Sequence, residues 1–277
     1  MKLIINSPAK INFGLFITEK REDGFHNIET VFYPLGLEDE IIIRECDHLL
    51  VETDNPDLNR DIESNLMTKA VRLLEQATGR ELPCRITLKK QIPMGAGLGG
   101  GSSNAASVLL GLNDLFGLDL SKEELKKLGL ELGSDVPFFI HPYPSVGKGR
   151  GELLTEIDLE LKGTIVVVNP GIHVATGAAY KSCKPAKAAV DLMELNGRKI
   201  MDFKELRGVV KNDFEVTVFR EHPMIAELKN KFYEAGAEFS LMSGSGSTVF
   251  GIFAEPGKAE SFSAALQQEY FVYQEEL

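Results

Sequence analysis

Two hydrophobic periods alternate along the chain, and they predict strands in some stretches and helices in others. Alternating or densely apolar stretches, typical of strands, cover residues 2–6, 7–17, 25–33, 40–44, 85–90, 164–168, 238–242, 248–253 and 270–273. Stretches with apolar residues every three or four positions, typical of helices, cover residues 64–79, 105–116, 121–132, 176–180, 223–234 and 258–269, and more loosely 191–210. This mixture predicts an α+β protein.

The pattern restarts near residue 158, which predicts two domains, residues 1–157 and residues 158–277. A chain of 277 residues suits two packed units. In the second domain the expected order is strand, helix, strand, strand, helix, strand, with extra helix after the first strand. That order is the split βαβ, or ferredoxin-like, plan.

Composition narrows the classes of function. The chain is 43% hydrophobic and 26% charged, which is ordinary for a globular protein with a sizeable core. Its net charge of −11 argues against a nucleic-acid partner, and no apolar run is long enough to suggest a membrane span. The three cysteines are far apart in sequence and predict no disulfide framework. We therefore expect a cytoplasmic protein. We also expect small-molecule partners and a monomer or weak homodimer, neither of which composition itself indicates.

A glycine-rich segment, Pro93 to Asn104, is the strongest chemical signal, with five glycines among residues 95–101. Glycine reaches positive φ without strain and lets the backbone approach a ligand closely. Ser102, Ser103 and Asn104 are helix-capping residue types, and an amphipathic stretch follows them. A glycine loop that leads into a helix N-terminus predicts a cradle for phosphate groups.

Other glycine-loop motifs fit this segment poorly. A P-loop requires Gly-Lys-Ser/Thr, and no lysine lies between Lys90 and Lys122. The G-x-G-x-x-G spacing of a dinucleotide site is present, but residues 91–94 separate the strand from the first glycine. The protein-kinase motifs H-R-D and D-F-G are missing. A flexible linker is the plain alternative, but Met94, Leu98 and the adjoining helix pattern argue against it.

Candidate catalytic residues lie far from this loop in sequence. Lys10 and Asn12 are two apart on a predicted strand and so share a face, although a solvated face would look the same. Asp135 stands at a break between a helix and an aromatic run, where a cap or turn aspartate is the common case. Together with a phosphate cradle these residues suit phosphoryl transfer from ATP: Asp135 would accept the hydroxyl proton and Lys10 would stabilise charge. Ser102 or Ser103 would ligate Mg²⁺ through a hydroxyl oxygen.

Three motifs resemble those of the GHMP small-molecule kinase superfamily: residues 8–12 (Pro-Ala-Lys-Ile-Asn), residues 93–106, and a C-terminal glycine turn at residues 243–247. Residues 9–12, 21–26 and 132–138 resemble most closely the branch that acts on a cytidine-diphosphate sugar alcohol of the non-mevalonate isoprenoid pathway. This resemblance implies a ribosomal-protein-S5-domain-2-like N-terminal domain, a ferredoxin-like C-terminal domain, and transfer to the 2-hydroxyl of the methylerythritol moiety.

The resemblance also implies roles for particular residues. Lys10 and Asp135 are the expected catalytic pair, and Phe25 and Tyr180 are expected to sandwich the cytosine while His26 reads its polar edge. Asn12 is expected near the erythritol. Phe25 stands where the branch usually has tyrosine, so stacking would persist without the phenol hydrogen bond. The expected ATP-binding residues are Asn65, Lys90, Pro93, Met94, Gly95, Ala96, Gly97, Leu98, Gly99, Gly100, Gly101, Ser102 and Ser103.

Two other functions remain open from the sequence. A GHMP kinase for homoserine or a mevalonate-type alcohol would share the loop but would have no base to stack. A non-catalytic nucleotide-binding or sugar-binding regulator would share the fold, although the presence of both Lys10 and Asp135 argues against it.

Overall fold

A computed structural model describes residues 1–55, 58 and 62–277 of the chain. The described residues form two compact units, each assembled from separate segments of the chain. Unit 1 comprises residues 1–10, 34–94 and 99–142, and unit 2 comprises residues 11–33, 95–98 and 143–277. Because each unit combines separate segments, this division does not test the predicted domain boundary at residue 157, which stays a prediction.

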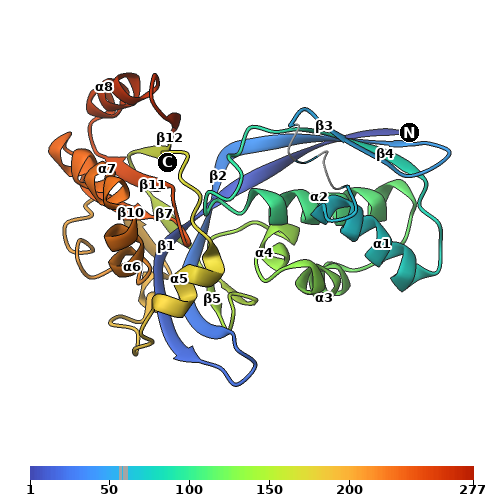
Figure 1. Cartoon of the computed structure of the whole chain (residues 1–277), viewed down its shortest axis with the longest axis horizontal. Helices are drawn as coiled ribbons and strands as arrows, with labels where there is room; N and C mark the ends of the chain where they lie inside the picture. Colours follow the sequence, from blue (N-terminus) through green and yellow to red (C-terminus); the bar gives the residue numbers. More distant parts are fainter. Residues whose placement is uncertain (56–57, 59–61) are drawn as a thin grey trace. The chain divides into compact units, whose positions relative to one another are not determined.

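Unit 1 contains a sheet with helices packed on one face (Figure 1). Its strands are parts of β1 (Lys2–Lys20) and β2 (His26–Glu45), together with β3 (Leu50–Thr53) and β4 (Cys84–Lys89). β1 pairs with β2, β2 is antiparallel to β4, and β3 is parallel to β4. The helices are α1 (Leu66–Thr78), α2 (Gly100–Leu115), α3 (Lys122–Leu132) and α4 (Val136–Ile140).

Helix α2 lies close against this sheet because Gly111 has no side chain. A Cβ on Gly111 would lie 2.5 Å from Ile5 Cδ1 and 2.7 Å from Ile43 Cδ1. These isoleucines come from β1 and β2, so the helix that follows the glycine loop packs on these two paired strands of the unit 1 sheet. Close packing of this kind leaves little freedom for the helix N-terminus.

Unit 2 contains an antiparallel sheet in the order β10-β11-β8-β12. These strands are β8 (Thr164–Asn169), β10 (Phe239–Met242), β11 (Val249–Phe253) and β12 (Phe271–Glu276). Helix α7 (Pro223–Glu234) comes between β8 and β10, and α8 (Pro256–Leu266) comes between β11 and β12. The strand order and the helix positions confirm the predicted ferredoxin-like plan.

Aromatic residues form much of the core between these helices and the sheet of unit 2. The Phe232 and Phe262 rings, from α7 and α8, have centroids 4.5 Å apart, and Phe253 of β11 lies 5.8 Å from Phe262. The other elements of unit 2 are β5 (Ser145–Lys148), β6 (Leu153–Glu156), β7 (Leu159–Leu161), α5 (Thr176–Ser182), the 3-10 helix η1 (Leu192–Leu195), β9 (Arg198–Ile200) and α6 (Glu215–Glu221).

Several local predictions were wrong. Residues 191–210 do not form a loose helix, because Gly197 and Gly208 have left-handed φ of +73° and +77° and interrupt it. Residues 2–17 form one continuous strand rather than two. The elements that were not predicted include β3, α4, β5, β6, β7, β9 and α6. Helix α2 begins at Gly100, so Ser102, Ser103 and Asn104 lie inside its first turns instead of capping it.

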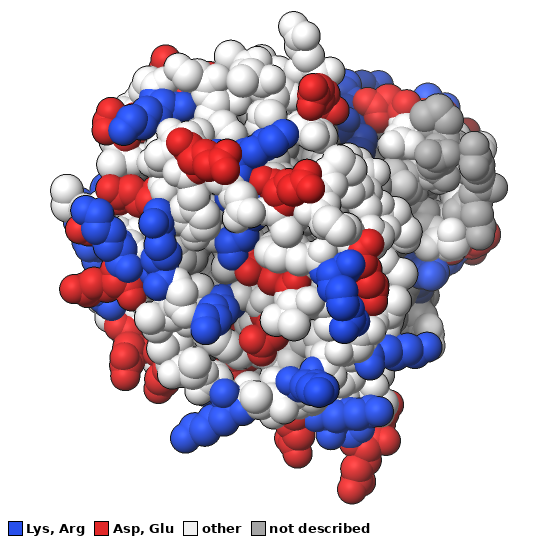
Figure 2. Space-filling model, turned by 60° about the vertical axis from the view of Figure 1, so that its left-hand side comes forward, with Lys and Arg blue, Asp and Glu red and all other residues white. Residues whose placement is uncertain are grey.

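Charged side chains of both signs are mixed on the surface. Figure 2 shows Lys and Arg side chains interspersed with Asp and Glu over the visible face. Among the helices that the structure describes, none is both long and apolar enough to cross a bilayer.

Candidate active site

Lys10 and Asp135 meet in unit 1, although 124 positions separate them in the sequence. Lys10 Nζ lies 3.4 Å from Asp135 Oδ2, and the exposed fractions of the two side chains are 4% and 32%. Asp135 is at the N-cap position of α4, but its side chain makes no capping hydrogen bond. The carboxylate therefore faces a buried ammonium group and is still partly open to solvent.

The second half of the glycine loop lies beside this ion pair. Gly99 is the N-cap of α2 with φ +73°, and no side chain caps the helix by a hydrogen bond. A Cβ on Gly99 would lie 3.1 Å from Lys10 Cε and 2.7 Å from Phe139 Cζ. The start of a 16-residue helix is thus next to the lysine. Its first amides and the positive end of its dipole suit a phosphate group.

The first half of the loop belongs to unit 2 and rests on the C-terminal glycine turn at residues 243–247. Ser243 Oγ donates a hydrogen bond to the Gly97 carbonyl at 2.9 Å. The Thr248 amide donates to the Ala96 carbonyl at 3.3 Å. A Cβ on Gly97 would lie only 2.1 Å from the Ser243 carbonyl oxygen, so this close approach requires glycine. Two motifs that the sequence identified separately are therefore in direct contact.

The two candidate serines in α2 differ in their surroundings. Ser103 is fully buried and its Oγ accepts a hydrogen bond from Ser7 Oγ at 2.8 Å. Ser102 is only partly buried, and its Oγ lies 3.9 Å from a Cβ built on Gly133, two residues before Asp135. Among the described residues, no group of three or more His, Cys, Asp or Glu could hold a metal ion. Because Ser102 is partly exposed and Ser103 is buried against Ser7, Ser102 is better placed to offer an oxygen ligand to a hard cation.

Asn65 and Lys90 both have structural partners in unit 1. Asn65 is the N-cap of α1, and its Oδ1 accepts a hydrogen bond from the Met67 amide at 2.9 Å. Lys90 Nζ lies 2.5 Å from Asp39 Oδ2. Burial lowers the pKa of Lys90 and is the largest influence on it, although the neighbouring Asp39 carboxylate acts in the opposite direction. Asn65 thus caps α1, whereas Lys90 lies against Gly100 of the loop.

The ends of the loop differ in exposure. Met94 is 46% exposed, and its Sδ accepts a hydrogen bond from Asn55 Nδ2 at 3.3 Å. Ala96 and Leu98 are buried. Gly95, in unit 2, has φ +60° and lies against a histidine, because a Cβ on it would be 3.3 Å from His173 Nδ1.

The residues predicted to bind a base lie in unit 2. The His26 and Tyr180 rings are stacked, with centroids 5.1 Å apart and an interplanar angle of 17°. Phe25 is 52% exposed, and the Arg150 guanidinium lies 4.8 Å from the centre of its ring. Burial, with a smaller effect from Lys20, lowers the pKa of His26, which favours its neutral form. A neutral imidazole has one donor and one acceptor nitrogen with which to read the edge of a base.

Asn12 is almost fully buried in unit 2 and has several partners there. Its Nδ2 donates to Thr30 Oγ1 at 2.9 Å, and its amide donates to Ser243 Oγ at 3.2 Å. Thr30 Oγ1 in turn donates to the Gly14 carbonyl at 2.6 Å. Asn12 therefore connects the strand of Lys10 to the glycine turn that supports the loop.

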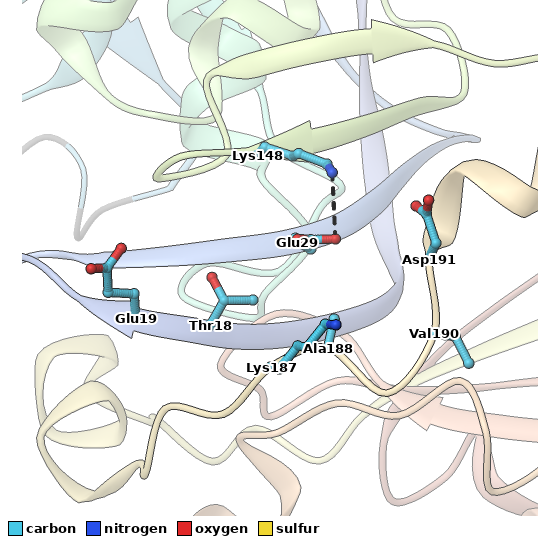
Figure 3. A pocket seen from close by; sticks show the side chains of 8 residues that line it. All are labelled: Thr18, Glu19, Glu29, Lys148, Lys187, Ala188, Val190 and Asp191. Carbon is cyan, nitrogen blue, oxygen red and sulfur yellow. Dashed lines mark ion pairs between the residues drawn. The ribbon is translucent and has the colours of Figure 1, made fainter.

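Unit 2 also contains a cavity that the sequence did not predict (Figure 3). It has a volume of about 670 Å³ and includes an ion pair between Lys148 Nζ and Glu29 Oε2 at 3.7 Å. Its other lining residues are Thr18, Glu19, Lys187, Ala188, Val190 and Asp191. Glu29 is three positions from His26 on β2, so the two side chains point to opposite faces of the strand. His26 is not among the described residues that line the cavity.

Sequence reasoning missed Asp39 and Arg150. Arg150 lies in the glycine-rich turn that joins β5 to β6. Asp39 stands between two glutamates, which is typical of a solvated stretch. The period-two row of Leu37, Asp39 and Ile41 was the available signal, because it places Asp39 on the apolar face of its strand.

Comparison with known proteins decides the family. The family model described as GHMP kinases N terminal domain matches residues 65–142, and that described as GHMP kinases C terminal matches residues 186–272. The chain belongs to the GHMP kinase family. These matches confirm the resemblance that the three motifs indicated.

Two relatives are similar over nearly their whole lengths. A protein of Bacteroides fragilis named 4-diphosphocytidyl-2-C-methyl-D-erythritol kinase is 42% identical over 276 residues, which is 97% of each chain. The crystal structure of a 4-(cytidine 5'-diphospho)-2C-methyl-D-erythritol kinase matches with a TM-score of 0.80 and 33% identity, covering 98% of each chain. A homoserine kinase from Cytophaga hutchinsonii has a TM-score of 0.75 at 17% identity, with 100% of this chain and 95% of that one covered. At 17% identity, the similarity to the homoserine kinase shows a shared fold alone.

Proposed function

We propose that this GHMP kinase transfers the γ-phosphoryl group of ATP to the 2-hydroxyl of 4-diphosphocytidyl-2-C-methyl-D-erythritol, a step of non-mevalonate isoprenoid precursor biosynthesis. The observation that carries the proposal is the ion pair of Lys10 and Asp135 at 3.4 Å, with Lys10 against Gly99 of the glycine loop. The substrate assignment is supported by relatives with this name at 42% identity over nearly the whole chain.

The reaction needs a base, charge stabilisation and a held phosphate chain. Asp135 accepts the proton of the 2-hydroxyl as its oxygen attacks the γ-phosphorus, and the bond to the ADP oxygen breaks. Lys10 stabilises negative charge on the transferring group, since its ammonium is buried and close to the loop. The amides at the start of α2 hold the phosphates.

The residues beside the loop could offer a magnesium ion a hydroxyl ligand. Mg²⁺ prefers oxygen ligands and commonly takes most of them from nucleotide phosphates and water, with one or two from the protein. We propose Ser102 as the protein hydroxyl ligand. When bound with ATP, the ion would neutralise charge on the phosphates.

The cytosine is held by contacts of two kinds. We propose that Phe25 and Tyr180 stack on the cytosine and that neutral His26 reads its polar edge; because the Tyr180 ring is stacked on the His26 ring in the structure, the base would have to replace His26 on that face. The partial exposure of the Phe25 ring leaves it accessible to a ligand. Homoserine and mevalonate have no base, and likeness to their kinases is restricted to the fold.

The partners of this reaction are two small molecules, ATP and the cytidine-diphosphate sugar alcohol. We place the reaction in the cytoplasm, because Cys46, Cys84 and Cys183 are free thiols, as expected in a reducing compartment.

The test is an assay of ADP release with 4-diphosphocytidyl-2-C-methyl-D-erythritol, homoserine and mevalonate as alternative acceptors. We expect turnover with the first and none above background with the others. Asp135→Ala should bind ATP normally and lose turnover by about a hundredfold or more, the low end for a positioned base. Asp47→Ala, which changes an exposed aspartate, is the control. Preference for another acceptor would overturn the substrate assignment, and near-normal turnover of Asp135→Ala would remove Asp135 from the mechanism.

A further inference from the structure

Asp39 is a fully buried carboxylate beneath the glycine loop, in unit 1. Its Oδ1 accepts the amides of Gln91 at 2.7 Å and Ile92 at 2.9 Å. Its Oδ2 accepts Lys90 Nζ at 2.5 Å and Asn104 Nδ2 at 2.9 Å. Four donors on one carboxylate are enough to stabilise its charge away from water.

These donors come from both sides of the loop. Lys90, Gln91 and Ile92 are the residues through which the chain leaves β4 and approaches Pro93. Asn104 lies in the second turn of α2, after the glycines. One side chain of β2 therefore fixes the beginning and the end of the loop relative to each other.

Two further contacts tighten this arrangement. A Cβ on Gly100 would lie 2.9 Å from Lys90 Nζ and 3.0 Å from Ile92 Cγ2, so the first residue of α2 rests directly on the groups that Asp39 holds. Asn104 Nδ2 also donates to Ser7 Oγ at 3.0 Å, and Ser7 Oγ donates to Ser103 Oγ at 2.8 Å. The first turns of α2 are thereby attached to β1 as well as to β2.

We propose that Asp39 is a positioning residue for ATP, which sets the spacing between the approach to the glycine loop and the first turn of α2. The inference rests on the proposed ATP-dependent reaction. Lys90 acts with it from beneath the loop, as the counter-charge that lets the carboxylate stay buried. All the side chains and amides of this network lie in unit 1, next to the amides proposed to bind phosphate.

The decisive variant is Asp39→Asn. It keeps the acceptor for Gln91 and Ile92, but its NH₂ group would face two other donors, Lys90 Nζ and Asn104 Nδ2, and the negative charge is lost. We expect the KM for ATP to rise by about tenfold or more, while the KM for the cytidine-diphosphate acceptor stays within about twofold. The double variant Asp39→Asn, Asn104→Asp returns a carboxylate to the cluster and should restore most of the ATP affinity.

Glu75→Gln is the matched control. Glu75 is also in unit 1, and it accepts a backbone amide, that of Leu82 at 3.0 Å, and a cationic group, Arg72 Nη1 at 2.8 Å. Glu75→Gln weakens these two contacts and so lowers stability, but it leaves the Asp39 contacts intact. The KM for ATP should therefore be unchanged. The split between the two KM values and the rescue by exchange are effects that a general loss of stability would not produce.

Direct titration with a non-hydrolysable ATP analogue separates the possible failures. If the parent chain binds no nucleotide, the proposed function itself is wrong. If the parent binds and Asp39→Asn binds within twofold of it, the positioning role of Asp39 is wrong. If Asp39→Asn does not fold, the milder Asn104→Ser decides: a nucleotide affinity reduced by about threefold or more supports the role, and an unchanged affinity overturns it.

Discussion

The contact between Gly99 and Lys10 makes a sharp prediction for Gly99→Ala. Gly99 has φ +73°, where a side chain costs about 1 kcal/mol of stability. The new Cβ would also lie 2.7 Å from Phe139 Cζ and 3.1 Å from Lys10 Cε, whereas ordinary contact begins at 3.4 Å. Phe139 must therefore retreat by about 0.7 Å and Lys10 by about 0.3 Å, at an overpacking cost of about 1–3 kcal/mol.

Gly197→Ala is a close control for this substitution. Gly197 has the same φ of +73°, but a Cβ there would have no neighbour within 4 Å, so only the backbone cost of about 1 kcal/mol applies. At about 2–4 °C per kcal/mol for a chain of this size, we expect the thermal midpoint to fall by roughly 8 °C for Gly99→Ala and roughly 3 °C for Gly197→Ala. The two variants thus separate backbone strain from side-chain collision.

The functional readout is kcat in the ADP-release assay. A misplacement of about 1 Å in a reacting group can cost about a hundredfold, so a smaller shift of Lys10 should lower kcat by about 10-fold to 100-fold. Gly197→Ala should keep the parental kcat. The reasoning is refuted if Gly99→Ala keeps kcat within threefold of the parent and its midpoint falls no further than that of Gly197→Ala.

Two other predictions concern pH and the loop itself. Burial lowers the pKa of His26 in the folded chain below its ordinary value of 6.5. The imidazole is therefore neutral in both the folded and the unfolded chain well above pH 6.5. As the pH falls below 6.5, the unfolded chain binds a proton before the folded chain does, and this favours unfolding. The stability difference between the parent and His26→Gln should therefore shift against the parent from pH 8 to pH 5 in urea unfolding, and a pH-independent difference would contradict this. Gly101→Ala should keep or slightly raise the thermal midpoint, since its Cβ would lie 3.6 Å from Leu66 Cδ1, an ordinary contact inside a helix. It should nevertheless raise the KM for ATP several-fold, and an unchanged KM would mean that the phosphates do not approach Gly101.

The elements with local signals could be predicted from the sequence. Helix α7 has the predicted bounds, residues 223–234, because Pro223 begins it and Gly236 follows its end. The capping box of Ser121 and Glu124 is present at the start of α3. The ferredoxin-like order followed from the sequence of periods alone, since each strand and helix in it is short and strongly patterned.

Contacts between distant segments could not be predicted in the same way. Gly97 and Ser243 are 146 positions apart, and nothing in either motif specifies that a carbonyl of one lies against the Cα of the other. The meeting of Lys10 and Asp135 was expected from chemistry and resemblance, not from spacing. Residues 191–210 misled the helix prediction because apolar positions there recur loosely while two glycines adopt left-handed conformations.

The glycines of the loop meet requirements set by the protein before any ligand is considered. Gly97 is required by the Ser243 carbonyl, Gly99 by Lys10 and Phe139, and Gly100 by Lys90 and Ile92. Gly97 therefore has its close neighbour in unit 2, whereas Gly99 and Gly100 have theirs in unit 1. Gly101 alone among these four meets only an ordinary contact, which makes it the position where a need for glycine would come from the nucleotide. A cradle that is held in place in advance loses little entropy when it binds phosphate, and this would favour the proposed binding of ATP by a loop without a lysine of its own.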